Sequence, residues 1–185
     1  MTFDDRSGLD VHHATLGILG MGRIGRAVAR RAAGFDMRIL YHNRNRLDPA
    51  VERSVGAEYV TLEALLAQSD FVSLHLPYTA DNHHVIGAAE LAKMKRSAIL
   101  VNASRGGLID EQALIEALRS GRIAGAGLDV FEGEPKVNPG LVGLDNVVLA
   151  PHMGSATRAT RMAMARLAIE NLGEALSGGI PRCLV

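Results

Sequence analysis

The chain has 185 residues, 48% of them apolar, which is enough for one domain with a sizeable core. Twenty basic and twenty acidic residues cancel, so no net charge attracts nucleic acid or an anionic membrane. No apolar run approaches the roughly 20 residues that span a bilayer, and the N-terminal residues lack the pattern of a secretory signal. The single cysteine, Cys183, cannot form an internal disulfide. We therefore expect a cytoplasmic globular protein without nucleic-acid or membrane partners.

Short apolar runs alternate with helical patterns along the chain. Thr61 is a candidate cap for a helix over 62–68, Asp110 for a helix over 111–119 that Gly121 closes, and a long final helix is expected over about 156–176. The predicted strands are Leu16–Leu19, Met37–Tyr41, Glu58–Val60, Phe71–Leu76, Ala98–Asn102, Gly125–Val130 and Val147–Ala150. This alternation predicts an α/β fold with a doubly wound parallel sheet.

A glycine-rich turn follows the first predicted strand. Gly20, Gly22 and Gly25 have the spacing GxGxxG and lead directly into a helical pattern. The first glycine allows the tight turn, the second allows a pyrophosphate to approach the backbone, and the third allows the helix to pack against the strand. Phosphate would then bind at the helix N-terminus, where free N–H groups favour anions. The turn predicts a Rossmann-type dinucleotide-binding domain.

The end of the second predicted strand bears on cofactor choice. An acidic residue at this place grips the ribose hydroxyls of NAD, but this chain has Asn43, followed by Arg44 and Arg46. Arginines can pair with a 2′-phosphate. We expect NADP(H) to be preferred with NAD(H) still possible, and the alternative interpretation is a solvated basic turn.

Candidate catalytic groups follow three later strands. Arg105 follows the fifth strand and precedes two glycines, which suggests a backbone held close to a bound group. The sixth strand leads into an acidic segment, and His152 follows the seventh. Arginine, carboxylate and histidine at one edge of a sheet could polarise a carbonyl, orient an imidazole and supply a proton. Taken alone, a histidine at such a place is more often structural.

Five segments together resemble the D-isomer-specific 2-hydroxyacid dehydrogenases, and within that family they look most like glyoxylate and hydroxypyruvate reductases. The segments are the glycine-rich turn 20–25, Leu76-Pro77-Tyr78-Thr79, Val101-Asn102-Ala103-Ser104-Arg105-Gly106, Ala126-Gly127-Leu128-Asp129-Val130-Phe131 with Glu134-Pro135, and Pro151-His152-Met153-Gly154-Ser155-Ala156-Thr157. The resemblance covers nearly the whole chain.

The resemblance implies roles for individual residues. Arg105 would bind the substrate carboxylate and polarise its 2-oxo group, His152 would protonate the oxygen, and Glu134 would hold that histidine and favour its protonated form. Asp129 would orient the nicotinamide carboxamide. The resemblance and the two turns described above together give the other cofactor-binding residues. They are Gly20, Gly22, Arg23, Ile24, Gly25, Asn43, Arg44, Leu76, Pro77, Ala103, Ser104 and Gly154. The reaction implied is hydride transfer between NAD(P)H and a short 2-oxoacid such as glyoxylate or hydroxypyruvate.

The chain departs from the family in its organisation. We expect an N-terminal remnant at 1–13, a dinucleotide-binding domain at 14–177 and a tail at 178–185 directed toward a substrate domain that the chain lacks. Members of the family usually dimerise through the cofactor domain, so the partners implied are a second copy and a separate substrate domain. The alternative is a truncated, non-catalytic nucleotide-binding or interaction module.

The remaining histidines and methionines predict no further site. The adjacent pairs His12-His13 and His83-His84 would point their side chains apart in an extended chain, so we expect no metal. Met162 and Met164 on the final helix are expected to be packing or interface residues.

Overall fold

The computed structural model describes residues 8–183. They form two compact units, one extending to Ala150 and the other beginning at Pro151. Residues 1–7 of the predicted N-terminal remnant and 184–185 of the predicted tail lie outside the described residues. Within the described part, no helix has the length and apolar character needed to cross a membrane.

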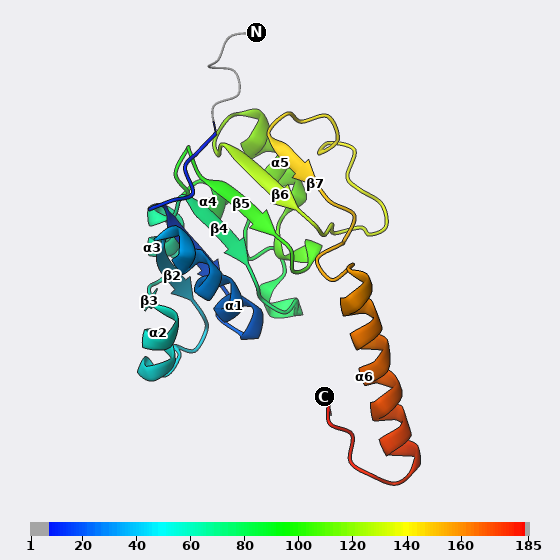
Figure 1. The fold of residues 1–185 in the computed structure, drawn as a ribbon. Helices are drawn as coiled ribbons and strands as arrows, with labels where there is room; N and C mark the ends of the chain where they lie inside the picture. Colours follow the sequence, from blue (N-terminus) through cyan, green and yellow to red (C-terminus); the bar gives the residue numbers. More distant parts are fainter. Residues whose placement is uncertain (1–7, 184–185) are drawn as a thin grey trace. The chain divides into compact units, whose positions relative to one another are not determined.

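The first unit is built on a seven-stranded parallel sheet of order β3-β2-β1-β4-β5-β6-β7 (Figure 1). All seven predicted strands are present, with ends shifted by one or two residues, and the parallel sheet is confirmed. The strands are β1 Thr15–Leu19, β2 Arg38–His42, β3 Ala57–Tyr59, β4 Phe71–Leu74, β5 Ile99–Asn102, β6 Gly125–Leu128 and β7 Val147–Leu149. The order reverses between β1 and β4, the point at which ligands bind in sheets of this kind.

The helices of this unit begin and end at local signals. The side chain of Thr61 accepts a hydrogen bond from the Ala64 N–H, and that of Asp110 from the Ala113 N–H, so both predicted caps are confirmed. Asp48 caps a further helix, α2, which the sequence analysis did not predict. The helices are α1 Arg23–Ala32, α2 Pro49–Val55, α3 Leu62–Gln68, α4 Ala88–Leu91 and α5 Glu111–Arg119, with 3₁₀ turns η2 Ala33–Phe35, η3 Ala80–Asn82 and η4 Gly106–Leu108.

Apolar side chains pack on both faces of the sheet. Leu16 and Ile18 of β1 belong to a cluster with residues of α1 and α2, whereas Leu19 belongs to a second cluster with residues of α3, α4 and α5. A Cβ built on Gly17 would collide with Leu65 of α3, so this strand position also faces the second cluster. Because successive strand residues face opposite sides, the two clusters lie on opposite faces. The doubly wound α/β architecture is confirmed.

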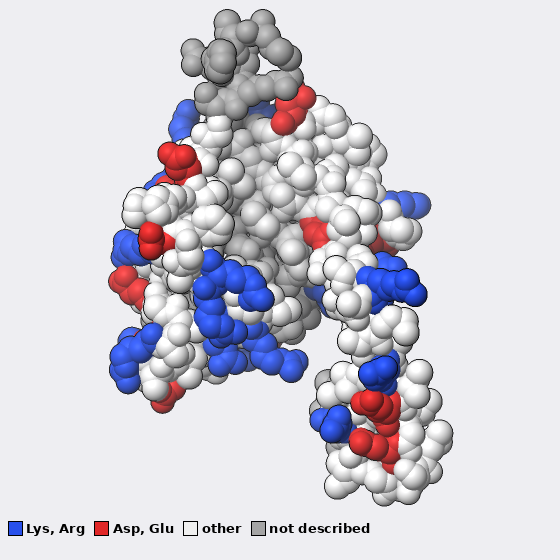
Figure 2. All heavy atoms as spheres, viewed as in Figure 1, with Lys and Arg blue, Asp and Glu red and all other residues white. Residues whose placement is uncertain are grey.

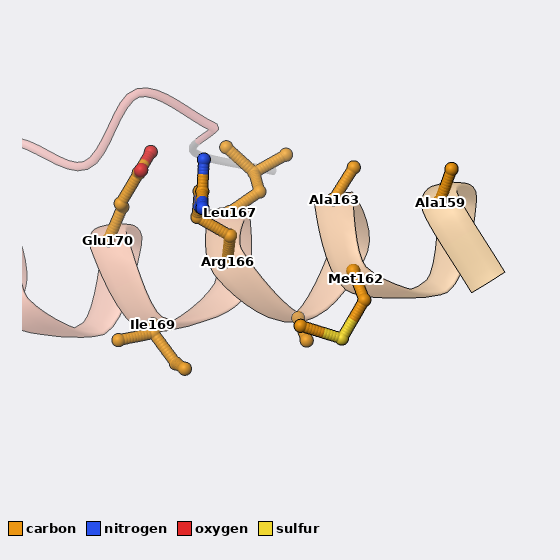
Figure 3. Close-up of a pocket in the computed structure, with 8 residues that line it drawn as sticks. Ala159, Met162, Ala163, Arg166, Leu167, Ile169 and Glu170 are labelled. Atoms are coloured by element: carbon orange, nitrogen blue, oxygen red, sulfur yellow. The ribbon is translucent and has the colours of Figure 1, made fainter.

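The second unit contains one long helix, α6 Arg158–Leu176, which begins two residues later than predicted because Thr157 is its cap. Figure 3 shows Met162 and Ile169 on one side of the helix and Leu167 on another. These three residues are among those that line a hollow of about 520 Å³. Met162 is 64% and Ile169 71% exposed. The helix also carries Arg158, Arg166 and Glu170, so its apolar and charged side chains are interspersed rather than separated into two faces. The prediction that its methionines are packing or interface residues stays a prediction.

Candidate functional site

The carboxyl edge of the sheet gathers most of the predicted site residues. Gly20 follows β1, Asn43 follows β2, Ala103 follows β5 and Asp129 follows β6, with Leu76 two residues beyond β4. Parallel strands end at the same edge, so these residues share one rim of the first unit. Their roles toward a ligand stay predictions.

The three glycines of the turn meet three different surroundings. Gly20 has a φ of +102°, and a Cβ there would lie 2.7 Å from the carbonyl carbon of His75. A Cβ on Gly25 would lie 2.3 Å from the carbonyl oxygen of Gly20, whereas one on Gly22 would meet nothing within 4 Å. The first and third glycines are therefore required by the protein's own packing. The second leaves open space beside the N-terminus of α1, as a pyrophosphate cradle requires.

Positively charged side chains lie on the helix that follows the glycine-rich turn. The helix α1 carries arginines and no acidic residue in its first turn. Figure 2 shows basic side chains gathered over α1. The positive end of the helix dipole adds to these charges. The entrance to the turn thus favours an anionic ligand.

Asn43 connects the turn after β2 to the glycine-rich turn. Its side-chain oxygen accepts a hydrogen bond of 2.7 Å from the backbone N–H of Met21. The Tyr59 hydroxyl donates to the Asn43 carbonyl at 3.3 Å. Asn43 therefore fixes the relative position of two predicted cofactor-binding segments.

A hydrogen-bonded network around the buried residues Glu52 and Tyr41 holds the rest of the turn after β2. Arg46 donates two hydrogen bonds to Glu52, at 2.8 and 2.9 Å, and the Tyr41 hydroxyl donates a third at 2.6 Å. Hydrogen bonds from Arg46 first, and then from Tyr41, lower the pKa of Glu52 to about 2. Burial, and then the bond to Glu52, raises the pKa of Tyr41 to about 12. Both groups therefore keep their charge states across the physiological range.

The same network engages one of the two arginines that follow β2 and not the other. Arg46 is engaged by Glu52. Arg44 is exposed and forms no ion pair with any residue between 8 and 183. Both arginines were candidates for pairing with a 2′-phosphate, and the role of Arg44 toward a 2′-phosphate stays a prediction.

A cavity of about 550 Å³ opens beside this turn. Four of the predicted cofactor-binding residues line it, namely Asn43, Arg44, Leu76 and Pro77. Asn82, also in the lining, accepts a hydrogen bond from the Thr79 N–H at 2.8 Å and donates one to the Pro77 carbonyl at 2.7 Å. The volume suits a ligand of nucleotide size. With the open space at Gly22 and the basic α1, the donors present fit a dinucleotide phosphate.

Asn102 positions the turn that carries Arg105. It is 1% exposed, its side-chain nitrogen donates to the Arg105 carbonyl at 2.9 Å, and its oxygen accepts from the Ser104 N–H at 3.0 Å. The Ser104 hydroxyl donates to the Leu76 carbonyl, which ties this turn to the cavity wall. Arg105 itself is exposed. Sequence reasoning missed this role of Asn102, although a polar residue ending an apolar strand was the available signal.

The two glycines after Arg105 make close contacts with the protein itself, and the expectation of a bound group beside them stays a prediction. A Cβ on Gly106 would lie 1.9 Å from the carbonyl carbon of Phe131, and one on Gly107 would lie 2.7 Å from the ring of Tyr78. The backbone after Arg105 thus packs directly against the segment after β6.

That segment contains Glu134. Its carboxylate accepts a hydrogen bond of 3.0 Å from the Phe131 N–H, and the neighbouring Glu132 N–H donates to the carboxylate of buried Glu111 at 2.7 Å. Gly106 and Phe131 therefore connect the Arg105 turn to the loop that carries Glu134. His152 and Gly154 belong to the second unit.

Comparison with known proteins agrees with this arrangement. Residues 2–154 match the family model described as D-isomer specific 2-hydroxyacid dehydrogenase, NAD binding domain. The chain is 54% identical over 178 residues to a glyoxylate reductase of Thermococcus litoralis, covering 96% of this chain and 54% of that protein. It is 56% identical over 180 residues to a glyoxylate/hydroxypyruvate reductase B of Erwinia tasmaniensis, covering 96% and 56%.

Solved structures give the same result. A glyoxylate reductase from Paecilomyes thermophila superposes with a TM-score of 0.88 at 52% identity, over 94% of this chain and 52% of that one. A D-lactate dehydrogenase with NAD⁺ from Lactobacillus jensenii superposes with a TM-score of 0.89 at 29% identity, over 100% and 59%. The chain spans about half the length of the curated relatives it matches. It belongs to the D-isomer specific 2-hydroxyacid dehydrogenase family and carries that family's NAD binding domain.

Proposed function

We propose that this chain is the cofactor-binding part of an NAD(P)-dependent oxidoreductase that reduces a short 2-oxoacid, such as glyoxylate or hydroxypyruvate, to the D-2-hydroxyacid. The observation that supports it most is the carboxyl edge of the sheet. There the open space at Gly22, the basic α1 and the cavity of about 550 Å³ lie along one rim. The identity of 54–56% to proteins named for glyoxylate reduction supports the substrate class.

Three side chains perform the chemistry in this proposal. The guanidinium of Arg105 binds the substrate carboxylate and draws electron density from the 2-oxo group. His152 donates the proton that the oxygen takes up, and Glu134 holds that imidazole in its protonated form. When bound, the nicotinamide supplies the hydride. Asn102 holds the turn that presents Arg105.

The cofactor preference follows from Arg44. It lines the cavity, is exposed, and stands in the turn where other members place a carboxylate against the ribose hydroxyls. A guanidinium there forms charge-assisted hydrogen bonds with a 2′-phosphate, which are stronger than those it can form with a hydroxyl. We therefore keep NADP(H) as the preferred cofactor and NAD(H) as a second one.

Arg44→Asp is expected to reverse this preference. Loss of a charge-assisted pair should raise the Kd for NADPH by roughly 10–100-fold, while the Kd for NADH stays level or falls. Fluorescence titration of both cofactors gives the ratio. Arg96→Asp, the same charge change on an exposed residue before β5, away from α1 and outside the cavity lining, is the control and should leave the ratio unchanged. An unaltered NADPH-to-NADH ratio in Arg44→Asp would remove the basis for the preference.

The catalytic proposal is tested in a chimaera, because the chain spans about half of its relatives. This chain replaces the matching 178 residues of the Thermococcus litoralis enzyme, and glyoxylate-dependent oxidation of NAD(P)H is followed by absorbance. His152→Ala is expected to lower kcat by about 10²–10⁴-fold with the cofactor Kd unchanged. His12→Ala serves as the matched histidine control.

The outcomes separate the candidate functions. Unchanged turnover in His152→Ala would contradict the assignment of the acid. A chimaera that binds cofactor but never turns over would favour a nucleotide-binding module instead. The second copy, and the separate domain that would contact the substrate, belong to this proposal as partners and rest on the family resemblance.

A further inference from the structure

We propose that His83, His84 and Glu132 form a binding site for a divalent first-row transition-metal ion, with Zn²⁺ as its typical occupant. The expectation that adjacent histidines point apart is wrong for this pair. His84 has a φ of +53°, and the two rings stack with centroids 3.7 Å apart. The turned backbone therefore presents two imidazoles to the same side.

The donor atoms converge on one carboxylate. The Nε2 atom of His84 lies 2.7 Å from Oε1 of Glu132, and the Nε2 atom of His83 lies 3.9 Å from the same oxygen. The three ligand atoms all lie within 4.8 Å of one another. A tetrahedral ion with bonds of about 2.0–2.1 Å needs its ligands roughly 3.3 Å apart, so small side-chain adjustments complete the set.

The chemistry of the set selects the ion. Two imidazoles and one carboxylate are borderline donors that suit Zn²⁺ and its neighbours, and they suit Mg²⁺ or Ca²⁺ poorly. Three protein ligands leave a fourth position for water.

Residues around the set hold the ligands in place. The Tyr78 hydroxyl is hydrogen-bonded to Nδ1 of His83 at 3.1 Å, which leaves Nε2 as the nitrogen facing Glu132. The His84 backbone N–H donates to the Gly107 carbonyl at 2.9 Å, and the Glu132 N–H donates to buried Glu111. Such outer contacts orient ligands and raise metal affinity.

A second histidine pair offers a contrast within the chain. His12, His13 and Asp36 also lie close together, but Nδ1 of His12 is hydrogen-bonded to the Phe35 carbonyl. The side chains of His12 and Asp36 are 59% and 66% exposed, against 32% and 38% for His84 and Glu132. The His12 cluster is therefore the weaker candidate and a matched control.

The site would connect two segments of the carboxyl edge. Asn82, which lines the cavity, immediately precedes His83, while Glu132 lies in the loop that carries Glu134. A metal ion there would hold these segments together. The proposal does not depend on the oxidoreductase function.

The test is Zn²⁺ binding to the 185-residue chain, prepared without a histidine tag, in competition with a chromophoric chelator. The wild-type chain is expected to bind one Zn²⁺ per chain. Glu132→Gln and His83→Gln each remove a direct ligand, so each should weaken binding by more than the roughly 10–100-fold that loss of an outer partner costs. The double variant His12→Ala/His13→Ala should bind as the wild type does. Thermal unfolding without metal checks that each variant folds.

The effect of Zn²⁺ on the Tm is a second measurement of binding, which is needed if a variant folds poorly. Zn²⁺ should raise the Tm of the wild type and of the His12 variant, and leave that of Glu132→Gln unchanged. Absence of binding below about 1 mM would overturn the proposal. Wild-type Zn²⁺ affinity in Glu132→Gln and His83→Gln would also overturn it. Loss of Zn²⁺ binding in His12→Ala/His13→Ala would do the same.

Discussion

Replacement of Gly106 by alanine is expected to destabilise the first unit more than the same replacement at Gly22, Gly25 or Gly133. The new Cβ would lie 1.9, 2.1 and 2.3 Å from the Phe131 carbonyl carbon, its oxygen and the Glu132 nitrogen. All three are backbone atoms, so no side-chain rotation relieves the contact. We expect a loss of about 3 kcal/mol, the upper end for overpacking, and a Tm lower by roughly 6–12 °C.

The same substitution should affect the site. Gly106 follows Arg105, and Phe131 donates a backbone hydrogen bond to Glu134. Separating the two segments changes the distance between these proposed catalytic groups, so turnover of the chimaera should fall even below the Tm. Gly133→Ala is the control in the same loop, because its Cβ would meet only an ordinary contact of 3.7 Å. Equal Tm values for the two variants, measured by circular dichroism, would contradict this account of the glycine.

Gly25→Ala and Gly22→Ala are expected to separate folding from cofactor binding. A Cβ on Gly25 would lie 2.3 Å from the Gly20 carbonyl oxygen, so that variant should lose about 2–3 kcal/mol. A Cβ on Gly22 meets nothing, so its Tm should stay within about 2 °C of the wild type. The Gly22 methyl would nonetheless fill the space proposed for the pyrophosphate. We expect its Kd for NADPH to rise by about tenfold or more.

Thermal unfolding measures the Tm of each variant, and cofactor titration measures its Kd for NADPH. Gly34→Ala, which also adds a methyl to open space but lies outside the turn, should change neither. Wild-type cofactor affinity in Gly22→Ala would show that no phosphate approaches this backbone.

The parts of the fold that could be predicted are those that short stretches of sequence determine. Buried strands such as β1 and β5 are continuous apolar runs, and caps such as Thr61 and Asp110 act within three residues of themselves. The α2 helix was missed because its seven residues, PAVERSV, have no clear apolar period. Its cap, Asp48, was nevertheless readable.

Contacts across the sequence explain what could not be predicted in the site. Asn102 and Gly106 acquire their roles from partners on other turns. The engagement of Arg46 depends on Glu52, a residue of the unpredicted α2. The convergence of His83 and His84 depends on one positive φ, which a pattern of side chains does not reveal.

The central claim is that this chain carries a working dinucleotide site, and direct fluorescence titration of the purified chain with NADPH and NADH tests it. The account predicts saturable binding of one cofactor per chain, with a Kd between about 1 μM and 1 mM and with NADPH the tighter ligand. Binding of neither cofactor in that range would contradict it.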